Sequence, residues 1–364
     1  MKSKISLFIS FSMLLAVSFA SEQRIASLGG NAGFWEDDDQ NIYMFPSTMH
    51  NFNIAQIDGN DDMAKASFLF GESTKYGFFM NSNSDELLNI AYGSGSWGLL
   101  VGFDTNSAKY TETDADDEEA SSLNMKLAFG LSSSFGELGV NLNTHSIDNA
   151  EGDDPSSFAF GFNLRREQPI WEFSHMLVSF NFMSNELGTY AVDLGSGPDD
   201  FNYDDMTSLD LNVDLYRHWN LTEKTDLLFA LGFGYMSASA KRADDEVERE
   251  VDVTTMVLPR YTFAVETNLL DWATIRAGVN QHHFLSNSAK YSYNEIDSDN
   301  YDFSQELSGS GASDFNLLFG IGANYGGFKL DADLNPGFFI DPVSYITGFN
   351  GETIATQFSI TYTW

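Results

Sequence analysis

Cysteine is absent from the 364 residues, proline occurs only 7 times, and long apolar runs are scarce. Without cysteine no disulfide can stabilise the chain, so the class of small secreted domains held together by disulfides is excluded. Beyond residue 20 no apolar run approaches the roughly 18 residues that a membrane-spanning helix requires. The sequence therefore argues against a helical inner-membrane protein.

Basic residues are also few, with 18 Lys and Arg against 53 Asp and Glu, which gives a formal net charge of −35. A charge of this sign repels nucleic acid and bare anionic surfaces, so no nucleic-acid partner is expected and cations are the natural partners. Aromatic residues, in contrast, make up 15% of the chain and include 32 Phe. This mixture favours long strands with outward aromatic side chains and little helix.

Residues 1–20 have the three parts of a secretory signal peptide. Lys2 and Lys4 give a basic start, residues 5–17 form an apolar stretch, and residues 18–20 supply a small-x-small cleavage site. A retained anchor helix is the alternative, but the apolar stretch is short for a membrane span. The mature chain is expected to begin near Ser21.

From about residue 65 onward, segments of roughly ten residues alternate between apolar and polar positions, which is the period of a strand with two different faces. The pattern recurs at 158–165, 209–216, 227–235, 315–322 and 328–334. In a soluble sandwich the apolar face points into a core, whereas in a membrane barrel it meets lipid and the polar face lines the lumen. The clearest example alternates Leu123, Met125, Leu127, Phe129 and Leu131 with Asn124, Lys126, Ala128, Gly130 and Ser132.

Two features favour the membrane barrel. Short turns at 134–136 and 325–327 alternate with long acidic loops, among them 241–250 and 294–310, as on the two rims of an outer-membrane barrel. The sequence therefore predicts an all-β fold, a transmembrane antiparallel β-barrel of about fourteen strands, with fourteen to sixteen as the range. We expect the barrel to occupy residues 64–364 and the stretch 21–63 to form an N-terminal lumen or plug segment. Aromatic residues cluster near strand ends, as interfacial girdles require: Trp97, Tyr110, Trp171, Tyr216, Trp219, Tyr261 and Trp272.

Residues 358–364 read FSITYTW, an amphipathic strand whose last residue is aromatic. This strand resembles the assembly signal of bacterial outer-membrane proteins. The resemblance implies recognition by the barrel assembly machinery and a location in the bacterial outer membrane, in contact with its lipid and lipopolysaccharide. The alternation places four residues of this signal toward lipid, Phe358, Ile360, Tyr362 and Trp364, and four toward the lumen, Gln357, Ser359, Thr361 and Thr363.

Two segments near the ends of the sequence have a distinctive composition. Residues 24–33 read RIASLGGNAG and are followed by an acidic run and by NIYMFP at 41–46, and residues 335–348 precede the last strand. Both segments are similar to those of the long-chain fatty-acid transporter-like (FadL-like) and PorV-like barrels, except that Phe45 stands in place of the family's Asn before Pro46. The resemblance implies a lumen partly filled by the N-terminal segment, and a role either in moving hydrophobic molecules or in secretion.

Ionisable residues on the presumed inner face are the candidate lumen lining. They would form either cross-strand ion pairs or a constriction that selects a solute. The candidates are Lys126, Arg165, Asp210, Asp214, Arg217, Arg260, Arg276, Lys329, Asp331 and Asp333.

Acidic loops are the candidate metal sites, because carboxylate oxygens bind hard divalent cations. Either they are solvated loops, or they bind Ca²⁺ weakly and bridge to lipopolysaccharide, and none has the spacing of a calcium-binding loop. His282 and His283 point to opposite faces of a strand, so they cannot bind one metal together. The proposed weak calcium site is Asp114, Asp116, Asp117, Glu118 and Glu119.

No motif of a hydrolase, metalloprotease or nucleotide-binding enzyme occurs, so a non-enzymatic protein without a cofactor is expected. The leading hypothesis is an outer-membrane transport protein or channel for hydrophobic or small solutes. The alternative is a structural or interaction barrel with a closed lumen, such as a secretion accessory or a cation-binding surface protein. A third hypothesis, a secreted β-sandwich or adhesin, predicts a protein that stays in solution without detergent.

Overall fold

The computed structural model describes residues 22–59, 64–81, 88–110, 118–148, 155–186, 190–192, 201–203, 205–243, 247–295, 302–313, 315–340, 343, 345 and 355–364. The expected signal peptide lies outside these residues, as do Asp114, Asp116 and Asp117. In the part of the chain that is described, no helix is long and apolar enough to cross a membrane.

The described part of the chain starts with short helices and continues almost entirely as strands. The helices are α2 (Glu22–Ser27), η1 (Ala32–Phe34), α3 (Asn41–Met44), η2 (Pro46–Asn51) and, late in the chain, α4 (Gly337–Ile340). The shorter strands are β1 (Ile54–Asp58), β2 (Lys65–Phe70), β3 (Thr74–Asn81), β4 (Leu88–Ser94), β10 (Tyr190–Val192), β11 (Phe201–Tyr203), β16 (Asp302–Ala312), β17 (Asn316–Tyr325), β18 (Phe328–Leu334) and β19 (Ala355–Thr363). The longer strands are β5 (Trp97–Tyr110), β6 (Glu118–Ser133), β7 (Gly136–Asp148), β8 (Ser156–Ile170), β9 (Phe173–Asn185), β12 (Asp205–Thr222), β13 (Thr225–Ala243), β14 (Val247–Leu270) and β15 (Ala273–Glu295).

All strands except the small β10–β11 hairpin belong to one antiparallel sheet that closes on itself. Apart from β16 and β17, consecutive strands of this sheet pair with each other, β9 pairs with β12, and β1 pairs with both β2 and β19. Strands β16 and β17 both pair with β15, at residues 283–294 and 273–280 respectively, so they share one position in the ring. The described residues therefore form a closed barrel of 16 strands, which confirms the predicted fold class and lies within the predicted range.

The strands present an apolar outer face, as the alternation predicted. On β6, Leu123, Met125 and Leu127 are more than a third exposed, while Asn124 and Ala128 on the other face are buried. A closed barrel leaves no backbone groups unpaired at a sheet edge, as the interior of a bilayer requires. The belt of exposed apolar side chains around it matches the surface that contacts lipid. The chain is an outer-membrane β-barrel. On β19 and just beyond it, the outward residues are Phe358, Ile360, Tyr362 and Trp364.

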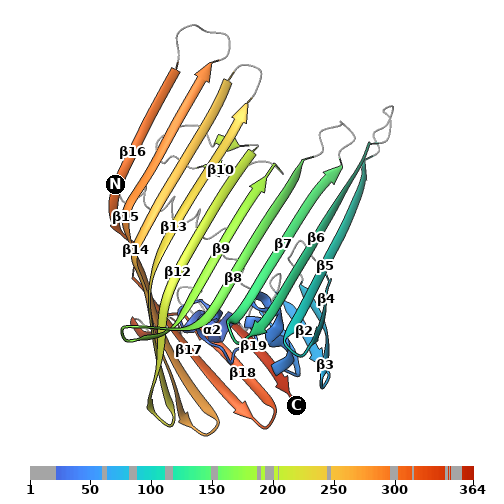
Figure 1. Ribbon diagram of the computed structural model, residues 1–364, viewed down its shortest axis with the longest axis vertical. Helices are drawn as coiled ribbons and strands as arrows, with labels where there is room; N and C mark the ends of the chain where they lie inside the picture. The colour runs from blue at the N-terminus through green and yellow to red at the C-terminus, as the bar shows by residue number, and fades with distance from the viewer. Residues whose placement is uncertain are drawn as a thin grey trace.

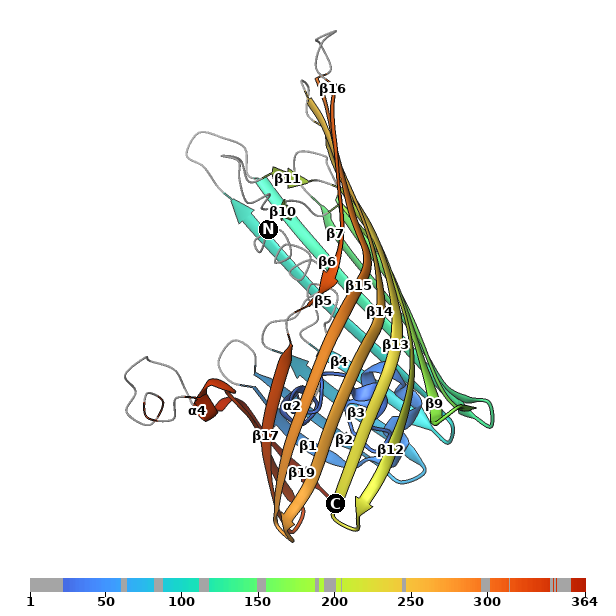
Figure 2. The ribbon, with the colours of Figure 1, turned by 90° about the vertical axis from the view of Figure 1, so that its left-hand side faces the viewer.

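The wall is much taller on one side than on the other, as Figure 2 shows for β12 to β16. Strand β14 has 24 residues and β15 has 23, whereas a tilted strand needs only about 9–11 residues to cross a bilayer. Parts of two expected acidic loops, 241–250 and 294–310, therefore lie in strands, because β13 to β16 continue their pairing beyond the membrane. Strand β1, with 5 residues, belongs to the low side and starts the wall ahead of the expected boundary at 64.

Candidate functional site

Residues 22–53, here called the plug segment, lie inside the barrel at the end that carries the short turns, where Figure 1 shows them in dark blue. Helix α2 contacts β15, β17, β18 and β19, and η2 contacts β3 to β7. These strands lie on opposite sides of the ring. The plug segment therefore crosses the lumen from wall to wall.

Apolar side chains of the plug segment pack against inward side chains of the wall. The rings of Phe34 and Tyr216 pack in a tilted arrangement with centroids 5.2 Å apart, and both residues are buried. Tyr216 was predicted to lie in an interfacial girdle, but it points inward because it alternates with the outward Leu215 and Arg217. A second cluster combines Ile42 and Met49 of the plug segment with Leu69, Phe79 and Leu100 of the wall.

Glycines on the inner face of the wall make room for the plug backbone. A methyl group at Gly139 would overlap the carbonyl oxygen of Met44, and one at Gly130 would lie 2.5 Å from the backbone nitrogen of Ser47. At Gly278 it would lie 2.7 Å from the carbonyl oxygen of Ser27. Backbone atoms cannot yield as a flexible side chain can, so these positions accept only glycine while the plug segment is seated.

Arg24 is the main ionic anchor of the plug segment. Its guanidinium donates to both carboxylate oxygens of Glu266 on β14, at 3.1 and 3.0 Å, and also pairs with Asp38. The Arg24 side chain is buried, and the neighbouring carboxylates raise its pKa further above the ordinary value in spite of its burial. Glu266 is shared with Arg276 on β15, which in turn contacts Asp331 on β18 at 2.6 Å. A buried pair of this kind fixes position, because loss of one partner leaves the other charge unpaired.

Arg165 on β8 is the second anchor. Its guanidinium donates to the carbonyl oxygen of Gly33 at 3.1 Å and to Asn41 Oδ1 at 2.8 Å. It also pairs with Glu137 on β7 and lies over the ring of Phe45, 4.7 Å from the centroid. The sequence singled out Arg165 by its inward position, but only the tertiary structure shows that it holds the plug segment.

The remaining candidate lumen residues fall into three groups. Asp214 pairs with Arg260 at 3.1 Å, and Asp210 accepts a hydrogen bond from Asn212 beside them. Lys329 contacts Asp331 at 3.5 Å, and Asp333 accepts from the backbone of Gln357 at 3.0 Å. Lys126 is half-buried on the same face of β6 as Asn124 and Ala128.

The prediction that Arg217 lines the lumen was wrong, because this residue lies on the outer face of β12. Its neighbour Tyr216 points inward, so the alternation directs Arg217 outward. There its guanidinium lies 5.3 Å from the centroid of Trp219 and contacts Glu172 at 3.4 Å. This rim position suits a long basic side chain beside an aromatic ring at a membrane interface.

A polar pocket of about 250 Å³ lies between the plug segment and the wall at the short-turn end of the barrel. Burial, with a smaller contribution from the negative charge of Asp38, raises the pKa of Asp39 to about 7 against the opposing positive charges of Lys329 and Arg24. The pocket is lined mainly by charged side chains, among them Arg24, Asp38, Asp39, Glu266, Arg276 and Lys329.

This raised pKa predicts a pH-dependent seating of the plug segment. Because the folded-state pKa of Asp39 lies above its ordinary 3.8, the seated form binds the proton more tightly than the released form. The stabilisation is complete below pH of about 4 and is lost as the pH rises through about 7. We expect protection of residues 36–44 from hydrogen exchange, corrected for intrinsic rates, to weaken between pH 5 and pH 8 by about 2 kcal/mol.

The control for this prediction is Asp39→Asn, which removes the titrating group and keeps the shape of the side chain. In that variant the protection is expected to be nearly independent of pH over the same interval. An equal pH dependence in both proteins would show that another group is responsible.

Metal ligands are not grouped among the described residues, where no set of three or more His, Asp or Glu side chains is placed to hold an ion. The proposed calcium site is only partly covered by the structure. Glu118 and Glu119 are the first residues of β6, where their backbones pair with those of Tyr110 and Lys109 on β5. The other three acidic residues of the proposed site lie outside the described residues.

The inner wall above the plug segment carries an apolar patch that was not predicted from the sequence. Its members come from five consecutive strands, β9 and β12 to β15. Six of the eight side chains are buried, and those of Met206 and Ala289 almost fully. The patch consists of Met183, Met206, Met236, Ala240, Val251, Val253, Ala289 and Tyr291.

The patch exists because the polarity of the two sheet faces inverts along these strands. On β13 the outward positions are apolar from Leu227 to Tyr235 but become Ser237, Ser239 and Lys241 higher up. The inward positions change from Gly232 and Gly234 to Met236, Ala238 and Ala240. An outer face that meets lipid below and water above accounts for this inversion. The inversion is visible in the sequence, and it was the signal that could have revealed the patch.

Between the patch and the plug segment lies a polar band. Asp214, Arg260 and His282 meet there, with Arg260 and His282 as register partners on β14 and β15. His283 lies on the outer face next to Tyr261, as expected from the opposite orientation of adjacent residues. On these strands, from the long-loop end toward the short-turn end, the inner wall is therefore apolar at the patch, polar at this band, and apolar again where it contacts the plug segment.

No family model and no curated protein matches the chain. Among solved structures it is similar to the toluene transporter TbuX of Ralstonia pickettii, with 9% identity over 96% of this chain and 98% of that one and a TM-score of 0.24. It is also similar to the toluene transporter TodX of Pseudomonas putida, with 10% identity, 95% and 98% coverage and a TM-score of 0.24.

The ferric-catecholate import receptor Fiu of E. coli K12 matches with 7% identity over 86% of this chain and 81% of that one, at a TM-score of 0.29. Scores this low carry no argument about function. The fold of the chain rests on its own strand pairing.

Proposed function

We propose that the barrel transports hydrophobic solutes across the outer membrane, taking them up at the apolar patch and passing them inward beside the plug segment. The observation that carries this proposal is the inverted polarity of β13 to β15, which creates a cluster of mostly buried apolar side chains on the inner wall at the long-loop end. A water-filled pore for polar solutes would need polar side chains there. Methionines adapt their shape to varied apolar ligands, and the patch contains three of them.

The plug segment makes this transport gated rather than open. It touches opposite walls and is held by Arg24 and Arg165, so solutes reach the short-turn end only when its packing yields. The same packing supports the second candidate function, an interaction barrel with a permanently closed lumen. The two functions differ in whether the plug segment moves.

The patch provides a direct test of the proposed cargo. Met236→Asn places an amide among apolar side chains, so the affinity for the fluorescent probe N-phenyl-1-naphthylamine is expected to fall about tenfold. Uptake of the same probe into proteoliposomes should fall with it. Fluorescence titration of the purified barrel in detergent and a stopped-flow uptake assay measure the two effects.

Ser237→Asn is the matched control, because Ser237 is the next residue on β13 and lies on the opposite, outward face. This variant should bind and transport the probe like the wild type. Equal affinities of the two variants for the probe would show that the patch is not the binding site. Absence of uptake by the wild type would contradict the proposed transport function.

A further inference from the structure

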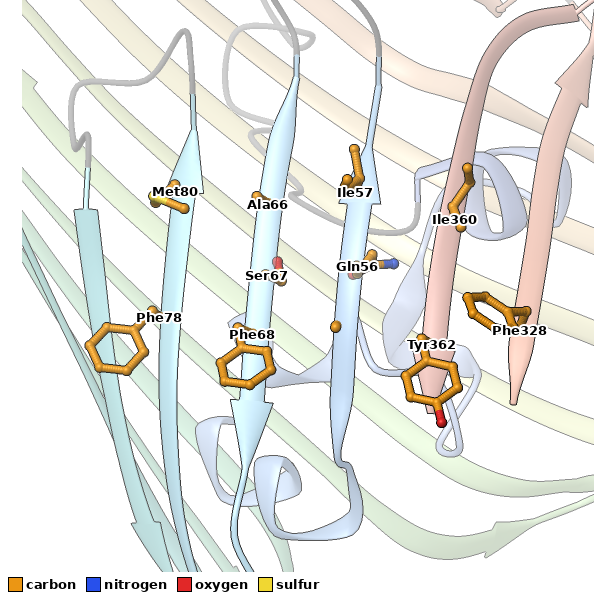
Figure 3. Close-up of a pocket in the computed structure, with 11 residues that line it drawn as sticks. Gln56, Ile57, Ala66, Ser67, Phe68, Phe78, Met80, Phe328, Ile360 and Tyr362 are labelled. Atoms are coloured by element: carbon orange, nitrogen blue, oxygen red, sulfur yellow. The ribbon is translucent and has the colours of Figure 1, made fainter. Parts of the chain in front are cut away.

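The outer face of the wall carries an apolar groove of about 350 Å³ over β1, the strand at which the barrel closes (Figure 3). Strand β1 has 5 residues and pairs along its whole length with β2 and with β19. The groove therefore lies over the first and last strands of the chain.

Two alanines produce the groove. In the pairing register, Ala66 lies between Met80 and Ile57, and Ala55 lies between Phe68 and Tyr362. Neighbouring strands are about 4.8 Å apart, so each alanine leaves a gap roughly 10 Å wide between larger side chains. Figure 3 shows Phe68 and Tyr362 on either side of the gap at Ala55.

Aromatic rings bound the groove at its short-turn end. Phe68 and Trp364 approach across β1 with centroids 5.8 Å apart, and Trp364 stacks on Tyr362 at 5.7 Å. The groove is thus a slot in the apolar belt, and it lies near the rim that faces the periplasm, since the short turns of outer-membrane barrels lie there.

A second apolar groove of about 270 Å³ adjoins the first and shares Phe328 and Ile360 with it as a dividing ridge. Its lining includes Trp272, Asn324 and Tyr325 next to the short turns. The indole of Trp272 and the phenol of Tyr325, both exposed, supply hydrogen-bond donors at the membrane interface, where Trp and Tyr commonly contact lipid headgroups.

We propose that these two grooves bind one glycerophospholipid of the periplasmic leaflet, with one acyl chain in each groove and the headgroup beside Trp272 and Tyr325. Two chains match two grooves divided by a single ridge, and the donors lie at the end nearest the periplasm. Lipopolysaccharide fits less well, because it carries more chains and occupies the opposite leaflet. The bound lipid covers β1 and so holds the seam of the barrel.

The test uses the full-length barrel, purified in mild detergent, washed by detergent exchange and examined by native mass spectrometry for retained lipid. Ala55→Phe and Ala66→Phe each fill the groove with a ring on the lipid-facing side. Ala277→Phe is the matched control, because Ala277 lies on the same face of β15 as the outward Ile275 and lines neither groove. Heat-modifiable migration establishes that each variant is folded.

The wild type and Ala277→Phe are expected to retain a stoichiometric phospholipid, and the two groove variants are expected to lose it. Absence of retained lipid from the wild type, or equal retention in the groove variants and the control, would overturn the proposal. Retention of lipopolysaccharide instead of phospholipid would overturn it as well. Probe uptake is measured separately, so failure of the lipid site and failure of the transport function are distinguishable.

Discussion

Oxidation of a Ser47→Cys/Ser132→Cys variant is expected to abolish uptake of the hydrophobic probe, and reduction is expected to restore it. Ser47 lies in the plug segment and Ser132 in β6, and their hydroxyl oxygens are 2.8 Å apart. Two cysteines at these positions would therefore lie within reach of a disulfide, which would fix the plug segment to the wall. Because the chain has no cysteine of its own, no other disulfide can form.

The two single-cysteine variants are the controls, since each carries the same side-chain change without the crosslink. Both should transport normally with and without reductant. Full activity of the crosslinked protein would show that solutes pass without movement of this part of the plug segment. No uptake by any of the proteins, crosslinked or reduced, would favour the interaction barrel.

The opposite effect is expected from Gly139→Ala, which should displace the plug segment and open the lumen. The added methyl group would overlap the carbonyl oxygen of Met44, and this carbonyl belongs to a backbone that is fixed on both sides by the Phe45 and Ile42 packing. Overpacking of this kind costs about 3 kcal/mol in a tightly packed site. We expect higher single-channel conductance in planar bilayers and faster trypsin cleavage at Arg24.

Gly309→Ala on β16 is the matched control for this variant, because a methyl group there would meet no atom within 4 Å. Alanine is otherwise as acceptable as glycine in a strand, so the control isolates the clash with the plug segment. Equal conductance of the two variants and the wild type would show that the wall can relax around the added methyl group.

The two experiments bracket the proposed mechanism. One fixes the plug segment and the other dislodges it, while the apolar patch is unchanged in both. If the plug segment is the gate, uptake falls in the first case and conductance rises in the second. A barrel with a permanently closed lumen would respond only to the second change.

The sequence by itself determined the closed barrel, its antiparallel order and the orientation of most strands. A period of two residues assigns every side chain of a strand to one of two faces, so the alternation alone directs Phe358, Ile360 and Tyr362 outward, where they lie. The predictions for Arg217 and Tyr216 were wrong because residue type was given more weight there than the alternation of β12, which places both side chains correctly. Alternation depends only on neighbouring residues, so it can be read from a single sequence.

The tertiary structure alone decided what the inner face does. Arg24 meets Glu266 across 242 positions of sequence, and Arg165 meets Gly33 across 132, and no spacing rule predicts such pairs. In the sequence the inward glycines resemble a generic small-residue lining, whereas in the folded barrel they lie against the plug backbone. Contacts between the plug segment and the wall depend on how the closed ring brings distant strands around one lumen, and this geometry is a property of the whole barrel.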